Sequence, residues 1–296
     1  MSHRQTETRE RPLLKLLLGS VCISFAPIFI RLADVSPDSA GFYRMMFASL
    51  SLLILIKLRK ENLNMARRPK LLLILAGVFL SIDFMCWHRS IGLIGPGLST
   101  LLGNFQIFFT ALFSWLFFQQ RISRLFILAV AMALCGLLLI TGGDWQVLQP
   151  GYKLGLLFGV LTALFYSGYI LLLKQALNDR SAQGVPSMLI VSIATTLLLA
   201  LITPVTGGSF AIPDSESLFA LIGAGVISST IGWSLISTAI KQVQATIAGL
   251  VLLLQPTLAL IWDVLLFDRP TGPMEIFGVL SILSAIYIGT YRKESV

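Results

Sequence analysis

QIFFTALFSWLFF, at residues 106–118, returns 149 residues later as QPTLALIWDVLLF, at residues 255–267. Gln106 then corresponds to Gln255, and the tripeptide AGV at 76–78 has an echo at 224–226. An offset near half of a 296-residue chain predicts that the chain is an internal duplication.

The composition indicates a membrane protein. Hydrophobic residues make up 56% of the chain, charged residues only 12%, and the mean hydropathy is +0.85, whereas about a quarter of the residues are charged in a soluble domain. A crossing needs about 20 apolar residues, and backbone groups inside a membrane must be satisfied within a helix. The sequence predicts ten membrane helices, at 13–33, 39–58, 70–90, 97–118, 124–142, 154–177, 185–205, 217–240, 246–267 and 273–291.

The basic residues predict the orientation of these helices. Of the 22 Lys and Arg residues, seventeen fall in the termini and the loops on their side, four in the opposite loops, and Arg44 inside a helix. The positive-inside rule then places both termini in the cytoplasm of a multi-pass plasma-membrane protein, which we expect to be a bacterial inner-membrane protein. Nucleic acid is excluded as a partner, because the basic residues are spread along one membrane face.

Five helices in each half mean that the second copy enters the membrane from the opposite side. Inverted repeats are typical of secondary transporters, whose substrate site lies near the midplane between the halves. The predicted fold class is an all-α integral membrane protein with ten transmembrane helices in two inverted five-helix repeats. The predicted boundaries are a cytoplasmic tail at 1–12, repeats at 13–142 and 154–291, and a tail at 292–296.

Three motifs carry a family resemblance: the Tyr43–Arg44 pair, the stretch LLLQPTLALI at 252–261, and Asp268 at the end of that helix. With them the chain resembles the drug/metabolite transporter superfamily, in particular its EamA-type ten-helix carriers. The resemblance implies a cavity lined by helices 1–4 and 6–9, with the fifth and tenth helices peripheral. It also implies export or exchange of small organic molecules such as amino acids, their derivatives or drugs.

The stretch LSIDFMCWHRS, at residues 80–90, places ionisable groups in an apolar segment. Ionisable residues inside a membrane are costly and are functional candidates by default. Asp83 lies about 20 Å along its helix from the cytoplasmic end, and Arg44 about 9 Å from the opposite end of its own helix, so their depths match. We predict that the two pair, either as a static structural link or as a substrate-contacting or proton-linked pair. His88 and Arg89 are predicted to reach water at the outer interface.

The predicted substrate-binding or cavity residues are Tyr43, Arg44, Asp83, Trp87, Asn104, Gln106, Tyr166, Tyr169, Trp233 and Gln255. The mid-helix amides are either interhelical hydrogen-bonding groups or uncharged substrate ligands. Ser228, Ser229 and Thr230 would add polar groups to the cavity or bond back to their own helix. Gly103, Gly249 and Pro256 are predicted helix-bending positions, and Pro256 corresponds to Ile107 in the first repeat.

Enzymatic chemistry is not expected. The chain has two histidines, of which only His88 lies in an apolar run, and it has no nucleophile-elbow or phosphate-binding loop motif. No cofactor or metal site is predicted, since its three cysteines lie inside apolar runs without metal-ligand spacing. The expected partners are a small-molecule substrate and the lipid bilayer, and a homodimer stays open.

The predicted function is secondary active transport, with export of small polar or amphipathic metabolites by alternating access. An exchanger or importer of nucleotide-like or amino-acid substrates is the alternative within transport. A non-transporting membrane scaffold or partner subunit is the alternative from another class.

Overall fold

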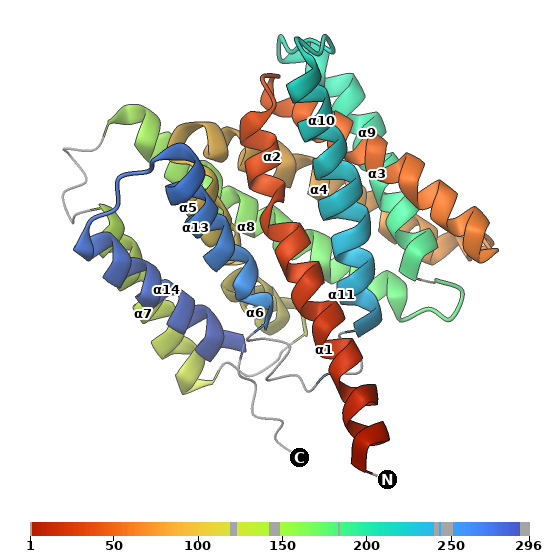
Figure 1. Ribbon diagram of the computed structural model, residues 1–296, viewed down its shortest axis with the longest axis horizontal. Coiled ribbons are helices and arrows are strands. Elements are labelled where there is room, and N and C mark those ends of the chain that lie inside the picture. Colours follow the sequence, from red (N-terminus) through yellow and green to blue (C-terminus); the bar gives the residue numbers. More distant parts are fainter. Residues whose placement is uncertain are drawn as a thin grey trace.

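The computed structural model describes residues 2–118, 123–141, 149–182, 184–239, 243 and 251–290. Every regular element among these residues is a helix (Figure 1). The helices are α1 (Ser2–Ser24), α2 (Ala26–Leu32), α3 (Pro37–Arg59), α4 (Arg67–Ile94), α5 (Pro96–Gly103), α6 (Gln106–Phe118), α7 (Arg124–Thr141), α8 (Pro150–Leu177), α9 (Gly184–Val205), α10 (Ser215–Gly223), η1 (Ala224–Gly232), α11 (Trp233–Ala239), α13 (Leu254–Phe267) and α14 (Pro273–Thr290).

These helices form an integral membrane bundle of ten spans in two inverted repeats, as predicted. Seven spans of the described chain are long and apolar enough to cross a membrane, and α7, α13 and α14 are shorter apolar helices. Large apolar side chains such as Ile127, Leu201 and Phe277 are exposed on the bundle's surface, which suits contact with lipid. Helix α1 begins and helix α14 ends at the same end of the bundle (Figure 1). We call this the terminus-bearing end and the opposite one the far end.

Local sequence explains where several helices begin. Ser36 precedes α3, and its side chain accepts a hydrogen bond from the Ser39 amide, with Pro37 in the first turn. Asp214 caps α10 in the same way through the Ser217 amide. Serine and aspartate are preferred at such positions because a side-chain oxygen satisfies one of the free amides of the first turn.

The inverted symmetry is visible in close helix crossings. A Cβ on Gly77 of α4 would lie 2.6 Å from the Ala194 Cβ of α9. A Cβ on Gly225 of η1, in the AGV echo of the second half, would lie 2.6 Å from the Phe47 Cβ of α3. Helix α4, the third span, thus approaches α9, the seventh, and η1, in the eighth span, approaches α3, the second. A two-fold axis between the repeats relates these two contacts, because it exchanges the third span with the eighth and the seventh with the second.

The fifth and tenth spans pair with each other at the side of the bundle. A Cβ on Gly136 of α7 would lie 2.6 Å from the carbonyl oxygen of Gly278 in α14, and a Cβ on Gly278 would lie 2.6 Å from the carbonyl oxygen of Gly136. The Ser281 hydroxyl also donates to the Met132 carbonyl, at 2.9 Å. This reciprocal contact again reflects the two-fold relation between the repeats.

Four predicted spans differ from continuous α-helices, the ninth by a turn at Leu253. The first is interrupted between α1 and α2 at Phe25, and the fourth between α5 and α6 at Asn104 and Phe105. The eighth contains η1, a π-helix in which the Ser229 and Thr230 hydroxyls donate to carbonyls five residues back. The helix of the first span also begins at Ser2 rather than at residue 13. The predicted bending position Gly103 directly precedes the interruption at Asn104, whereas the apolar pattern did not reveal those at Phe25 and in η1.

Candidate functional site

A central cavity of about 420 Å³ lies between the two repeats. This volume falls at the lower end of the range of small-molecule sites, roughly 300–1,000 Å³. Side chains from all the cavity helices implied by the family resemblance line it, from spans 1–4 and 6–9, and Ile286 of α14 is an addition from the tenth span. Nine of the ten predicted cavity residues line it: Arg44, Asp83, Trp87, Asn104, Gln106, Tyr166, Tyr169, Trp233 and Gln255.

Arg44 projects from α3 and is buried, with only 6% of the residue exposed. Its Nε donates a hydrogen bond of 2.9 Å to the Ser229 hydroxyl on η1. Its guanidinium carbon lies 4.6 Å from the ring centre of Phe84 and 5.2 Å from that of Trp87, within the range of cation–π contacts. Among the described residues, the Nη1 atom has no hydrogen-bond partner. The guanidinium is therefore oriented on one side and unsatisfied on another.

Asp83 on α4 is equally buried, with 4% of the residue exposed, and its Oδ1 has no hydrogen-bond partner in the described part of the chain. The ion pairs among the described residues do not include Arg44 with Asp83. The two opposite charges therefore form no direct ion pair, although both residues line the same cavity. Arg44 bonds instead to Ser229 and lies against the rings of Phe84 and Trp87. The matched depths of Arg44 and Asp83 along their helices are compatible with this geometry as well as with a direct pair.

The amides lie next to the interruptions of the fourth and ninth spans. The Asn104 side chain donates to the Thr100 carbonyl at 2.8 Å, and Gln106 accepts from the Thr110 hydroxyl at 3.2 Å. Gln255 is the second residue of α13, after a turn at Leu253. Asn104 and Leu253 are 149 residues apart, so the two interruptions are equivalent in the repeats. Irregular backbone inside a membrane is tolerated where it lines a cavity.

The predicted helix-bending residues have three different outcomes. Gly103 lines the cavity at the end of α5, where a Cβ would lie 3.3 Å from the Thr162 methyl group. Pro256 is buried in the first turn of α13, a position where the missing amide hydrogen breaks no helical bond. Gly249 lies outside the described residues.

Aromatic side chains form much of the cavity wall. The Tyr166 and Tyr169 rings have centroids 5.4 Å apart, and Tyr169 is within 3.8 Å of the Met188 sulfur. Tyr43, by contrast, does not line the cavity: its hydroxyl donates to the Phe210 carbonyl in the loop before α10. Its neighbour Arg44 faces the cavity because consecutive residues of a helix point about 100° apart.

The same repeats are recognised in comparisons with known proteins. The model of the EamA-like transporter family matches residues 11–142 and 153–291. The chain belongs to this family. It is accordingly a membrane transporter of the drug/metabolite transporter superfamily.

The chain is also similar to individual proteins over nearly its whole length. The chain is 23% identical over 285 residues to the pseudopaline exporter CntI of Pseudomonas aeruginosa, in strains UCBPP-PA14 and ATCC 15692, with 95% of this chain and 96% of the relative covered. A protein of known crystal structure matches with a TM-score of 0.65 at 16% identity, over 95% of this chain and 96% of that chain. This structural likeness supports the fold alone.

The far end of this EamA-family bundle is closed by a polar network around Asp38, at the start of α3. Arg89 donates to both Asp38 oxygens, at 2.6 and 2.7 Å, and the Thr206 hydroxyl donates to Oδ2 at 2.7 Å. His88 bonds through Nδ1 to the Pro37 carbonyl at 2.8 Å. With 3% of the residue exposed, His88 is buried, so the prediction that it reaches water is wrong. The network links α3, α4 and the turn that follows α9.

A second far-end network surrounds Asp263 on α13, which is also buried. Its Oδ2 accepts from the Gly97 amide at 2.9 Å and from Arg269 at 3.4 Å, and Arg269 also pairs with Glu275. A Cβ on Gly97 would lie 2.6 Å from the Leu260 Cα, so only glycine permits this approach of α5 to α13. The bonds of Asp263 join α13 to α5, a contact that its place along the helix alone does not reveal.

The cavity extends from the middle of the bundle toward the terminus-bearing end. On α3, which starts at the far end with Pro37, the lining residues run from Arg44 to Leu52. On α9, which starts at the opposite end with Gly184, they begin at Met188, one turn inside. The two far-end networks therefore lie between the cavity and the far side of the membrane.

Proposed function

We propose that this chain is a secondary carrier that exports small zwitterionic metabolites, of the amino-acid type, from the cytoplasm by alternating access. The observation that carries the proposal is a pair of buried, opposite charges in one cavity, the Arg44 guanidinium and the Asp83 carboxylate, each with one atom that has no hydrogen-bond partner among the described residues. A buried charge without a partner costs several kcal/mol. A ligand that supplies both partners regains this free energy when it binds.

A zwitterion matches this cavity in charge and in shape. Its carboxylate would accept hydrogen bonds from Arg44, and its ammonium group would donate to Asp83. The aromatic wall around Tyr166 and Trp233 suits an apolar or amphipathic remainder, and the amides of Asn104 and Gln255 can bond neutral polar groups. A purely anionic or purely cationic substrate would leave one of the two charges unsatisfied.

The direction of transport is inferred from the charge of the loops and from the relative. Seventeen basic residues on the terminus-bearing side favour a cytoplasmic location for that side, in a bacterial inner membrane. The cavity extends toward this side, as loading from the cytoplasm requires. The relative named as a pseudopaline exporter supports export. Release would need the Asp38 and Asp263 networks to separate, which defines the second state of the cycle.

Transport by the purified protein in proteoliposomes tests the proposal. Liposomes loaded with one amino acid at a time are assayed for counterflow of the labelled compound, with the wild type, Arg44→Gln and Asp83→Asn. Arg59→Gln is the matched control, because Arg59 pairs with Glu61 on the surface. We expect saturable flux of a subset of zwitterions, lost in both cavity variants and kept in the control. Flux of anions alone or cations alone would contradict the substrate class, and no flux of any solute would favour the scaffold alternative.

Cysteine labelling tests the orientation separately. In a cysteine-free background, Asn64→Cys in the loop after α3 should be shielded from an impermeant reagent in intact cells, whereas Ser209→Cys in the loop after α9 should react. The reverse pattern would place the termini outside, and the carrier would then work as an importer.

A further inference from the structure

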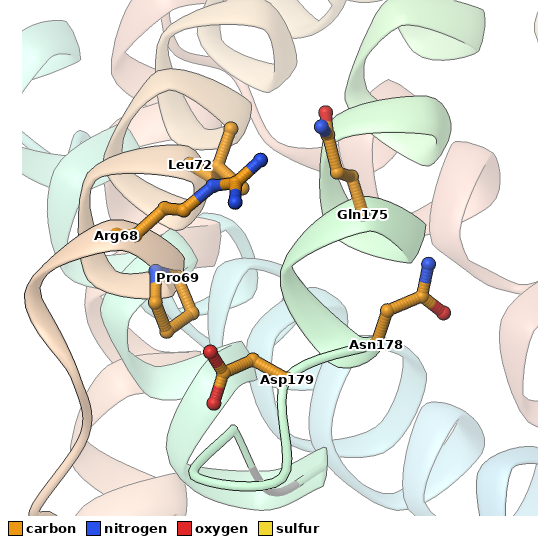
Figure 2. Close-up of a pocket in the computed structure, with 6 residues that line it drawn as sticks. All are labelled: Arg68, Pro69, Leu72, Gln175, Asn178 and Asp179. Atoms are coloured by element: carbon orange, nitrogen blue, oxygen red, sulfur yellow. The ribbon is translucent and has the colours of Figure 1, made fainter.

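A second cleft, of about 320 Å³, lies away from the central cavity. It is formed by the first turns of α4 and the end of α8, and it is lined by Arg68, Pro69, Leu72, Gln175, Asn178 and Asp179 (Figure 2). Both segments lie where an apolar span meets a polar loop, at the terminus-bearing end. The cleft therefore opens at the depth where lipid headgroups lie.

The cleft presents a positive group on one side. Figure 2 shows Arg68 extending from α4 toward the gap that separates it from α8. Arg68 takes part in no ion pair among the described residues. A guanidinium at the start of a helix is suited to a phosphate, because it offers paired donors and the helix end adds positive potential.

A negative group lies at the base of the same cleft. Asp179 Oδ1 accepts hydrogen bonds from the Ser181 amide at 2.9 Å and from its hydroxyl at 2.7 Å. The bond from the Ser181 amide, with that of the hydroxyl, lowers the pKa of the Asp179 carboxyl, which therefore stays charged at neutral pH. Its other oxygen remains free to accept from an ammonium group.

Neutral donors and acceptors complete the lining. The Gln175 and Asn178 side chains make no hydrogen bond to another described residue, and each can both donate and accept. Leu72 and Pro69 supply an apolar floor, and Leu75, one turn deeper on α4, is 44% exposed. An acyl chain attached to a headgroup in the cleft would continue along this exposed apolar face.

We propose that this cleft binds a headgroup that combines a phosphate with a primary amine, of the phosphoethanolamine type. Arg68 holds the phosphate, and Asp179 with the amide carbonyls accepts from the amine. An anionic headgroup such as that of phosphatidylglycerol would place neutral hydroxyls, rather than an ammonium group, against the Asp179 carboxylate. A choline headgroup has no N–H donor for Asp179 or the amides, and no aromatic ring lines the cleft to receive its methyl groups.

Lipid titration of the delipidated full-length protein, followed by native mass spectrometry, tests the site. Phosphatidylethanolamine, phosphatidylglycerol and phosphatidylcholine with identical acyl chains are compared. We expect phosphatidylethanolamine to bind about tenfold more tightly than the other two, which is the worth of one charge-assisted hydrogen bond. Arg68→Gln and Asp179→Asn should each remove this preference. Arg180→Gln, a neighbouring exposed cation outside the cleft, should keep it.

Competition with free phosphoethanolamine separates the two sources of this headgroup. Displacement of the lipid at equal concentration would assign the cleft to a soluble phosphoamine, whereas failure to displace it would assign the cleft to the lipid. Equal affinity of the wild type for all three lipids would overturn the proposal, and so would an equal loss in Arg180→Gln. The comparison among lipids uses the wild type alone, so it stands even if a cleft variant fails to fold. Transport activity is not a readout here, so the outcome is independent of the proposed substrate.

Discussion

The buried charged groups at the far end of the bundle and those in the central cavity differ in how fully they are hydrogen-bonded. At the far end, Asp38 has three hydrogen bonds from Arg89 and Thr206, and Asp263 is bonded to Gly97 and Arg269. In the cavity, Asp83 Oδ1 and Arg44 Nη1 have no hydrogen-bond partner among the residues that the structure describes. A satisfied buried charge holds helices together, whereas an unsatisfied one is a cost that a ligand can relieve. The comparison predicts that aspartate substitutions affect stability in one region and transport in the other.

Asp83→Asn should have the largest effect on transport. The amide keeps the size of the side chain but removes the charge that would bind the substrate's amine, so we expect flux to fall about a hundredfold. Thermal stability should be kept or slightly raised, because a buried carboxylate without a partner is replaced by a neutral group. Proteoliposome flux and thermal unfolding of the same preparation measure both quantities. Wild-type flux in this variant would remove Asp83 from the substrate site.

Asp38→Asn should show the opposite pattern. It leaves Arg89 with weaker bonds at a buried site, and we expect the free energy of unfolding to fall by about 2–4 kcal/mol. Because the Asp38 network closes the far end, the cavity should also become reachable from that side. Thermal unfolding in detergent and labelling of Thr100→Cys with an impermeant reagent from the far side test the two consequences. An unchanged melting temperature would show that the network does not hold the helices.

Helix crossings offer a comparison between the two repeats. Gly77→Ala and Gly225→Ala place a methyl group 2.6 Å from the facing helix in each case, and overpacking of this kind costs about 1–3 kcal/mol. Equivalent crossings should have similar costs. Gly92→Ala is the matched control, since nothing lies within 4 Å of its Cβ, and it should stabilise the protein by about 0.5–1 kcal/mol. Unequal losses at Gly77 and Gly225 would mean that the repeats contribute differently to stability.

Much of this architecture was predictable from sequence, for physical reasons. Hydrocarbon requires about 20 apolar residues per crossing and closed backbone hydrogen bonding, so composition predicted ten helices. The two AGV segments marked positions that prove to be close crossings. Depth along a helix placed Arg44 and Asp83 in one layer but did not give the rotation of each side chain. It therefore failed to show that Arg44 bonds to Ser229, that Tyr43 turns to the loop, or that Arg89 reaches Asp38.

Ser229→Ala should have the smallest effect, and it tests how far the cavity depends on preorganisation. The substitution removes the hydrogen bond to Arg44 Nε but leaves the guanidinium against Phe84 and Trp87. One hydrogen bond is worth about 1 kcal/mol, so we expect apparent substrate affinity to weaken about fivefold with little change in maximal flux.

The neighbouring residue provides the control for Ser229→Ala. The Ser228 hydroxyl donates to the Cys22 carbonyl at 2.9 Å, a contact between η1 and α1 that does not include Arg44. Ser228→Ala should therefore lower the melting temperature and leave apparent affinity unchanged. The two adjacent serines then reproduce, within one π-helix, the contrast between the far end and the cavity. Equal affinity losses in both variants would mean that substrate binding follows the general stability of η1 rather than the orientation of Arg44.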